Sequence, residues 1–392
     1  MAARRATSLA VALFVFGFGE ELWSRYLPEY LRGFGVTALG IGLFGTLKDF
    51  LDAAYAYPGG VLSDRLGTRN ALLLFGGLTT AGVTILLAWP SPAAVFVGLF
   101  FVTAWASFGL PATFALVGEE LAGGGRVVGF TVQSVLKRVP IVLAPPIGGL
   151  LLERFGLASG MRIGFAVSIV LSVGMLVYLS RALRRDLAPA PRRQPEGPEA
   201  PRPRLRPALR QLLVADCLIR LCEGLPDVFL VVWAIEIVKV SPPQFGLLTS
   251  IHMATAIAAY VPAAALAGRT EKKPFVILTY VFFTLFPLAV LVSKSFLALI
   301  AAFLIGGLRE IGEPARKALI VDLADPAARG RTVGTYYAIR GFAVAGAGAV
   351  GGGLWTIRPA LTFLAAAALG IAGTFWAARF LPASPPASEE TV

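Results

Sequence analysis

The sequence predicts an all-α membrane protein in which twelve transmembrane helices form two pseudo-symmetric six-helix bundles. Two observations predict this fold class: long segments that are continuously apolar, and a second half that repeats the pattern of the first. The chain has 392 residues, of which 56% are hydrophobic and 15% are charged. Soluble chains carry about a quarter charged residues, so the composition alone already indicates a membrane protein.

The apolar segments indicate helices rather than a β-barrel. The run ALLLFGGLTTAGVTILLAW (71–89) has the length of about 20 residues that a helix needs to cross a bilayer. Such runs are continuously apolar, whereas the strands of a barrel alternate apolar and polar residues. The first run, within MAARRATSLAVALFVFGFGEELW, has no small-residue cleavage site. We therefore expect it to be retained as a helix and not removed as a signal peptide.

The order of the apolar segments gives twelve expected spans. They lie near residues 8–31, 38–62, 70–90, 93–118, 127–152, 161–182, 209–236, 243–267, 274–293, 296–323, 332–355 and 359–380. Between the sixth and seventh spans, RRDLAPAPRRQPEGPEAPRPRLRP is rich in Pro and Arg and is expected to form an extended or disordered linker. The expected domains are an N-terminal bundle (1–182), a cytoplasmic linker (183–208), a C-terminal bundle (209–382) and a cytoplasmic tail (383–392).

The two halves of the chain align with each other. Gly42 falls on Gly246 at an offset of 204 residues, and GLPATFALVGE (109–119) falls on GEPARKALIVD (312–322) at an offset of 203. An offset that drifts this slowly is not expected by chance. It indicates two bundles in the same orientation, related by an axis along the membrane normal, with a binding site between them.

The positive charge is segregated between loops. The net charge of +12 would suggest a nucleic-acid partner in a soluble protein, but here the Lys and Arg residues concentrate in alternate loops, as the positive-inside rule describes. The residues on that side are Arg4, Arg5, Arg65, Arg69, Arg126, the linker arginines, Arg269, Lys272, Lys273, Arg329, Arg331 and Arg379. We therefore expect no nucleic acid as partner, and an integral protein of the cell membrane with both termini in the cytoplasm.

A charged motif, GGVLSDRLGTRN (59–70), follows the second apolar segment. It resembles the loop 2–3 signature of the major facilitator superfamily, and the matching residues are Gly60, Asp64, Arg65, Gly67 and Arg69. The resemblance implies the twelve-helix transporter fold, and a latch in which Asp64 binds the N-terminus of the eleventh helix and favours the outward-facing state. The alternative is that these residues are only loop charges that set the topology.

The fifth span carries a second, partial motif. APPIGG resembles an element of antiporter members of this superfamily, with Pro145, Gly148 and Gly149 matching and Ala144 in place of a glycine. The resemblance favours export, since small residues let helices pass closely. One departure weakens a proton-antiport interpretation: residues 93–117 contain no Arg or Lys, so the fourth-helix arginine of many such members is missing.

Several ionisable residues lie within predicted spans, where each costs a few kcal/mol unless it faces a partner or water. The simplest interpretation is internal pairing. Residues one helical turn apart on one face suggest four pairs: Glu21/Arg25, Lys48/Asp52, Asp216/Arg220 and Glu313/Lys317.

The alternative interpretation is functional. Glu20 and Glu21 project about 100° apart, so both cannot bind Arg25, and one is a candidate proton carrier or site for a cationic substrate. Lys137, Arg138 and Arg340 are candidates for binding an anion. His252 is interpreted as a gate residue and not as a metal ligand. All cavity or coupling candidates are Glu20, Glu21, Arg25, Asp49, Lys137, Arg138, Glu223, His252, Arg309, Glu310, Glu313 and Arg340.

The expected function is secondary transport of a small molecule by alternating access, with ion-coupled export of a drug or metabolite as the leading mode and protons as the candidate ion. One alternative is uptake or facilitated diffusion of a small polar or anionic nutrient. Another is a receptor or assembly factor that has a transporter fold and does not transport. The sequence contains no phosphate-binding loop or metal cluster, so we expect neither an enzyme nor a cofactor or metal. The family resemblance implies a monomer in the lipid bilayer.

Overall fold

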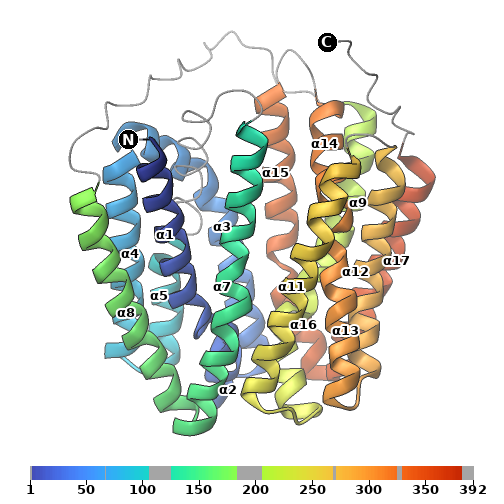
Figure 1. Cartoon of the computed structure of the whole chain (residues 1–392). Helices are drawn as coiled ribbons and strands as arrows, with labels where there is room; N and C mark the ends of the chain where they lie inside the picture. Colours follow the sequence, from blue (N-terminus) through green and yellow to red (C-terminus); the bar gives the residue numbers. More distant parts are fainter. Residues whose placement is uncertain are drawn as a thin grey trace. The chain divides into compact units, whose positions relative to one another are not determined.

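The computed structural model describes residues 2–66, 68–105, 125–182, 205–267, 271–324 and 329–381, and regular secondary structure in these ranges is helical (Figure 1). Four of the described helices are long and apolar enough by themselves to cross a membrane: Arg69–Ala88, Leu157–Ala182, Lys272–Val292 and Pro359–Phe380. The all-α prediction is therefore confirmed for the described residues, whereas the count of twelve spans stays a prediction. The expected linker lies almost entirely outside the described residues.

The chain divides into two compact units. Unit 1 comprises Met1–Thr37, Leu47–Gln194 and Ser241–Ser250. Its helices are α1 (Ala2–Glu21), η1 (Ser24–Tyr26), α2 (Leu27–Gly33), most of α3 (Ala38–Leu66), α4 (Thr68–Ala88), α5 (Pro92–Ala104), α7 (Gly125–Phe155) and α8 (Leu157–Ala182). Helix α1 packs against α7 and α8, and α4 packs against α5 and α8 (Figure 1). The apolar core between them includes Phe16, Phe75 and Trp105.

Unit 2 comprises Ala38–Thr46, Pro195–Val240 and Ile251–Val392. Its helices are α9 (Pro207–Asp227), α10 (Leu230–Val232), the π-helical turn η3 (Trp233–Ile237), most of α11 (Pro242–Ala267), α12 (Lys272–Val292), α13 (Phe296–Leu308), η4 (Arg309–Gly312), α14 (Glu313–Leu323), α15 (Arg329–Ala345), α16 (Ala347–Ile357) and α17 (Pro359–Phe380). Helix α17 packs along both α9 and α12 (Figure 1).

Several predicted spans are interrupted helices. The first breaks after Glu21 and resumes at Leu27, and the tenth changes to a 3-10 helix at Arg309–Gly312 before α14 begins. Each resumed helix has a proline in its first turn, Pro28 in α2 and Pro314 in α14. Proline lacks the N–H that an uninterrupted helix would need and fits the start of a new one. The sequence predicted single helices here, and the structure corrects that.

Prolines inside helices leave carbonyl oxygens without their usual donor. Pro146 in α7 removes the N–H that would bind the carbonyl of Val142, and the Ser250 hydroxyl donates to that carbonyl at 2.5 Å. In the same way Pro287 in α12 frees the carbonyl of Phe283, to which the Cys222 thiol donates at 3.4 Å. Backbone groups in a membrane must be satisfied inside the protein, so these side chains replace the missing donors.

The internal repeat reappears as a set of close helix crossings. An added Cβ at certain glycines would collide with a backbone carbonyl of another element, and the same collisions recur 203 or 204 residues later. Three pairs of contacts match. The contact of Gly148 with Leu22 matches that of Gly351 with Leu225, the contact of Gly149 with Pro242 matches that of Gly352 with Ala38, and the contact of Gly246 with Pro145 matches that of Gly42 with Gly348. Glycine permits these approaches because it has no side chain. The Pro145–Gly149 motif thus has a structural counterpart at 348–352.

The loops that precede α3 and α11 share a backbone conformation as well. Gly35 has φ of 79° and Lys239, 204 residues later, has φ of 65°. This left-handed region suits glycine and costs other residues roughly 1–2 kcal/mol. The second copy therefore keeps the conformation of the first although its side chain disfavours it.

We predict that Gly148→Ala lowers the thermal stability of the purified protein. The new methyl group would overlap the carbonyl oxygen of Leu22, which lies in the buried turn between α1 and η1, so a loss of roughly 1–3 kcal/mol is expected. Gly174→Ala in α8 is the matched control, because nothing lies within 4 Å of its added Cβ. Alanine favours a helix over glycine by about 1 kcal/mol. Equal melting temperatures of the two variants in detergent would contradict the assigned crossing.

Candidate functional site

Seven acidic and arginine side chains of unit 2 are linked by ion pairs, and we call them the charge cluster. They come from α9, η4, α14 and α15, and they are Asp216, Arg220, Glu223, Arg309, Glu313, Arg316 and Arg340. Elements that are distant in sequence thus contribute to one connected network. Because each of these charges would be costly alone in an apolar surrounding, their linkage stabilises the packing of these helices.

The centre of the charge cluster is a buried ion pair. The guanidinium of Arg316 lies 2.5 Å from Asp216, and the two side chains are 2% and 1% exposed. Arg316 also donates to both carboxylate oxygens of Glu313, at 2.6–3.0 Å. The hydroxyl of Tyr336 donates to Asp216 Oδ2 at 2.9 Å, and Arg340 donates to the same oxygen at 3.2 Å. Further hydrogen bonds help such a pair to offset its own desolvation, and here the donors converge on Oδ2 of Asp216, whereas its buried Oδ1 has no hydrogen-bond partner among the described residues.

The other side of the charge cluster is in contact with solvent. Arg220 donates to Glu223 at 2.6 Å, and their side chains are 24% and 28% exposed. Arg220 also lies 3.5 Å from Glu313, and Arg309 lies 3.5 Å from Glu223. Exposed charges inside a membrane face water and not hydrocarbon. This side of the charge cluster is therefore in contact with water.

Aromatic rings and the single histidine hold Arg309. Its guanidinium lies 4.7 Å from the ring centre of Phe283 and 4.8 Å from that of Phe286. It donates to the carbonyl of Gly306 at 2.9 Å, and its Nη2 lies 3.3 Å from Nε2 of His252. Cation–π contacts of this kind strengthen where water is excluded. Arg309 is thus held on one side by rings and on the other by His252 and Glu223.

The intrahelical pairs expected from the sequence are present in part. Arg25 donates to Glu21 at 2.8 Å, and Lys317 lies 3.5 Å from Glu313. The expected Asp216/Arg220 pair is wrong: Asp216 binds Arg316 and Arg340 of other helices. Arg220, the other half of that expected pair, binds Glu223 and Glu313 instead. Helical spacing places two charges on one face, but closer partners on neighbouring helices replace that contact. The Lys48/Asp52 pair stays a prediction.

The remaining candidates lie on several elements. Glu20 is in the last turn of α1, Asp49 is in α3, Arg138 is half-buried in α7, and Glu310 is half-buried in η4. The side chain of Lys137 lies outside the described part of the chain. Of the sequence candidates, the charge cluster brings together Glu223, Arg309, Glu313 and Arg340, with His252 beside them.

The loop 2–3 motif is described only in part. Gly67 and the side chains of Asp64 and Arg65 lie outside the described residues, as does the environment of Gly60. Arg69 donates to the carbonyl of Ser180 at 3.3 Å and so connects the start of α4 to the end of α8. The latch stays a prediction.

Aromatic residues near the predicted midplanes serve packing. The indole of Trp23 donates to Ser168 at 3.0 Å, and the Trp105 ring stacks on Phe16 at 4.1 Å. Tyr26 is fully buried and its hydroxyl donates to the carbonyls of Pro145 and Pro242 at 2.8 and 3.0 Å. These contacts hold neighbouring segments of the chain together.

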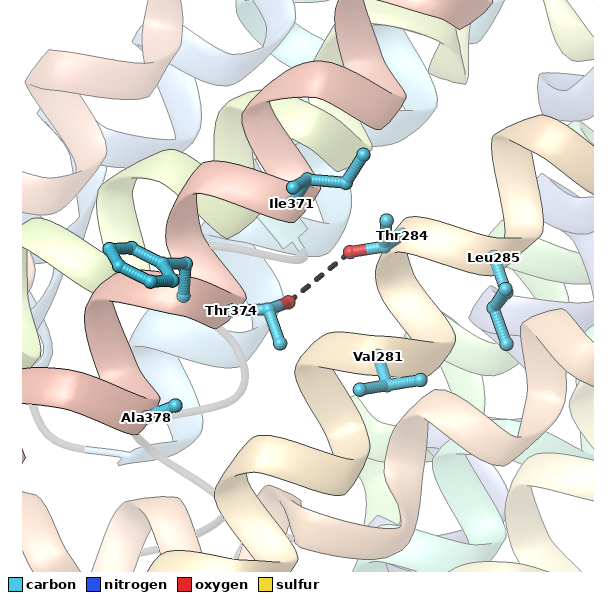
Figure 2. A pocket seen from close by; sticks show the side chains of 7 residues that line it. Val281, Thr284, Leu285, Ile371, Thr374 and Ala378 are labelled. Atoms are coloured by element: carbon cyan, nitrogen blue, oxygen red, sulfur yellow. Dashed lines mark hydrogen bonds between the residues drawn. The ribbon is translucent and has the colours of Figure 1, made fainter.

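A groove between α12 and α17 is a second candidate site. Its volume is about 330 Å³, and Val281, Leu285 and Ile371 contribute to its apolar lining. At its floor the hydroxyls of Thr284 and Thr374 lie 3.3 Å apart (Figure 2). No charged side chain lines this groove. It therefore cannot recognise a charged solute, and the charge cluster is the stronger candidate.

Several residues around the charge cluster were missed in the sequence. Tyr336 binds Asp216, and Phe283 and Phe286 flank Arg309, yet each resembles an ordinary apolar residue of a membrane helix. The available signal was the presence of acids and arginines in both the seventh and the tenth spans, which require partners. Among the described residues no group of three or more His, Cys, Asp or Glu side chains is placed to hold a metal ion.

The fold and the site together define a class of protein. Its members are helical membrane proteins in which paired charges contact water inside an apolar body. Intramembrane charges of this kind mark the paths of solutes and ions. The family model of the Major Facilitator Superfamily matches residues 9–224 and 212–392. The chain belongs to this superfamily and is an integral membrane protein of the transporter type.

Relatives and solved structures agree with this assignment. An MFS-type transporter of Mycobacterium tuberculosis is 23% identical over 180 residues, which cover 46% of this chain and 41% of that protein. A chloramphenicol resistance protein of Pseudomonas aeruginosa is 33% identical over 167 residues, which cover 42% and 38%. The match thus spans about two-fifths of the length of these curated relatives.

Two crystal structures share the fold. The peptide transporter POT in complex with sulfate has a TM-score of 0.78 at 17% identity, covering 96% of this chain and 93% of that chain. The human organic anion transporter MFSD10 has a TM-score of 0.64 at 17% identity, covering 96% and 99%. At such identities the likeness concerns the fold alone.

We predict that Arg316→Met strongly destabilises the protein. It leaves Asp216 and Glu313 charged without their shared guanidinium, and removing one partner of a buried pair costs about 3–5 kcal/mol. Lys317→Met is the matched control, since that side chain is 53% exposed and exposed pairs contribute about 1 kcal/mol or less. Thermal unfolding in detergent measures both. Similar melting temperatures would show that Arg316 does not hold the charge cluster together.

Proposed function

We propose that this protein is a secondary transporter that exports a small molecule by alternating access, driven by an ion gradient. In this proposal twelve helices form two six-helix bundles, residues 1–182 and 209–382, joined by a cytoplasmic linker at 183–208, and both termini are cytoplasmic. The observation that carries the proposal is the charge cluster, whose solvent-exposed side offers both acidic and basic groups to a solute.

Export is supported by two further features. A relative that is 33% identical over the matched region is named as a chloramphenicol resistance protein, and export of a drug is one way to confer resistance. The fifth-span motif Pro145–Gly149, which resembles that of antiporters, lies at close helix crossings.

A second candidate is uptake or facilitated diffusion of a small anionic nutrient, and Arg340 favours it. Its side chain is 20% exposed, stacks on the ring of Tyr337 at 4.7 Å, and makes one hydrogen bond, to Asp216. Arginine has five N–H donors, so the guanidinium retains donors for a carboxylate or phosphate group. Such an anion would bind beside the buried pair of the charge cluster.

We predict export in everted membrane vesicles that contain the protein. A panel of drug-like compounds, chloramphenicol among them, and of small organic anions is offered with and without an imposed pH gradient. At least one drug-like compound should accumulate in a gradient-dependent manner, and Glu223→Gln should reduce this because Arg309 and Arg220 lose a carboxylate partner. Accumulation of anions alone, in right-side-out vesicles, would instead support the uptake candidate. Transport of neither set would contradict the proposal.

We also predict that Asp64→Asn reduces transport and shifts the conformational equilibrium. The neutral amide loses the charge that would stabilise a helix N-terminus, an interaction worth about 0.3–1 kcal/mol at an exposed helix end. Asn70→Ala, in the first turn of α4, is the control. The measurements are transport and the labelling rate of single cysteines introduced in loops on each side of the membrane. If both are unchanged, Asp64 is only a topology-setting charge.

A further inference from the structure

We propose that the groove between α12 and α17 is a binding site for an anionic phospholipid of the surrounding bilayer. One acyl chain of the lipid would occupy the groove, and its phosphate group would bind Arg379 in the last turn of α17. The inference goes beyond the proposed transport and does not depend on it. It assigns a ligand to a groove that lies apart from the charged residues of the charge cluster.

The groove lies between two helices that are each able to cross a membrane. Helices α12 and α17 are among the four described helices that are long and apolar enough for this, and they lie side by side (Figure 1). Of the lining side chains, Leu285 is 41%, Ile371 59% and Phe375 67% exposed. Large apolar side chains exposed together mark a membrane contact. The medium on this face is therefore lipid and not water.

A close helix crossing forms one end of the groove. An added Cβ at Gly370 of α17 would lie 2.6 Å from the hydroxyl oxygen of Thr284 and 3.0 Å from its Cα, so a larger residue would push the two helices apart. Within the next turn of α12 lies Pro287, and proline bends a helix. On the other side of the crossing the lining includes the small side chains of Thr374 and Ala378 (Figure 2). These leave space between the helices.

The hydroxyl groups at the floor of the groove already have partners inside the protein. Thr284 donates to the carbonyl of Tyr280 at 2.9 Å, and Thr374 donates to the carbonyl of Gly370 at 2.8 Å. Because a hydroxyl has one proton, each is committed either to this carbonyl or to the other hydroxyl, 3.3 Å away (Figure 2). The floor therefore has no donor to offer to a ligand, and an alkyl chain suits the lining better than a polar group.

The dimensions of the groove suit an acyl chain from one leaflet. Its volume of about 330 Å³ is at the lower end of the range of small-molecule pockets, about 300–1,000 Å³. From Ile371 to Ala378 the groove follows α17 for roughly 10 Å, at 1.5 Å per residue. The hydrocarbon core of a bilayer is roughly 30 Å thick, so one leaflet supplies about 15 Å. A chain of the leaflet at the Arg379 end would lie in the groove for most of that depth.

A cation lies where the phosphate group of such a lipid is expected. Arg379 is exposed and follows Phe375 by one turn of α17, so the two residues share a face of the helix. Its guanidinium lies 5.5 Å from the ring centre of Phe380 and has no ion-pair partner within the described part of the chain. Its N–H donors are therefore available to a phosphate group, which arginine can bind through two parallel hydrogen bonds.

The charges at this end of the groove favour an anionic headgroup over a zwitterionic one. The ends of α12 and α17 that meet here, with the ion-pair partner of Lys272, carry the cations Lys272, Lys273 and Arg379 and the acids Glu271 and Asp322. The balance is positive, and a zwitterionic headgroup would add its own cation to it. Basic sites between transmembrane helices bind anionic lipid headgroups in this way. The observed charges and the apolar lining thus fit the two parts of one molecule.

The first test measures which lipid the protein retains. The purified full chain is mixed in detergent with equal amounts of phosphatidylglycerol and phosphatidylcholine that have the same acyl chains, and native mass spectrometry counts the lipids that stay bound. We expect phosphatidylglycerol to be preferred, and Arg379→Gln to weaken its binding about fivefold, the effect of one basic residue near a membrane surface. Arg358→Gln, at the opposite end of α17, is the matched control and should bind as the wild type does. Equal retention of the two lipids, or equal losses in the two variants, overturns the proposal.

The second test asks whether the acyl chain occupies the groove. Ala378→Leu places a larger side chain in the groove and should lower the retention of phosphatidylglycerol, whereas Ala368→Leu, exposed on the same helix outside the groove, should not. Melting temperatures without added lipid show that both variants are folded, and added phosphatidylglycerol should then raise that of Ala378→Leu less than that of Ala368→Leu. Unchanged retention in Ala378→Leu overturns the proposal, as does a dimer in the wild-type spectra that this variant abolishes, because a second copy of the chain would then cover the groove. Neither test requires transport, so a failure here leaves the proposed function in place.

Discussion

The charge cluster depends on one constraint: a charge placed inside an apolar helical body must have partners. The pair formed by Asp216 and Arg316 is nearly inaccessible to solvent, and Glu313, Tyr336 and Arg340 add further hydrogen bonds to it. Without them the desolvation of two charges would exceed their attraction. The requirement fixes the relative rotation of α9, α14 and α15, since a small rotation of any one of them would separate an acid from its arginine. It also makes the exposed side of the cluster possible, because Arg220 and Glu223 extend a network that is already anchored.

The same constraint acts on the backbone. Glycines bring helices close, and prolines bend helices and leave a carbonyl group to be satisfied. The hydroxyl of Ser250 and the thiol of Cys222 supply donors where Pro146 and Pro287 have none. Glycines at matched positions of the two halves let carbonyls of neighbouring elements approach. Small residues therefore determine where elements cross, and polar side chains keep these crossings free of unsatisfied groups.

Much of the fold was predictable because the length of the apolar segments and the spacing of the internal repeat can both be seen directly in the sequence. The predicted helices agree with the structure in type throughout the described residues, and the repeat of Gly42 at Gly246 corresponds to matched crossings. The interruptions at Glu21 and Arg309 were missed, since Pro28 and Pro314 lie within predicted spans and a proline does not by itself reveal a new helix. The partner of Asp216 was missed for a different reason. Its arginine lies 100 residues away, and only packing decides which of several charges meet, whereas the Glu21–Arg25 pair follows from spacing within one helix.

The matched glycine crossings show which features the two halves share. The same close contacts recur at an offset of 203 or 204 residues, and a left-handed lysine stands in one copy where the other has glycine. The charge cluster, by contrast, is assembled from the second half alone. The two copies thus share their backbone spacing, whereas the linked charges occur in one copy. Such a division lets one bundle carry charged groups without a change in the repeated contacts.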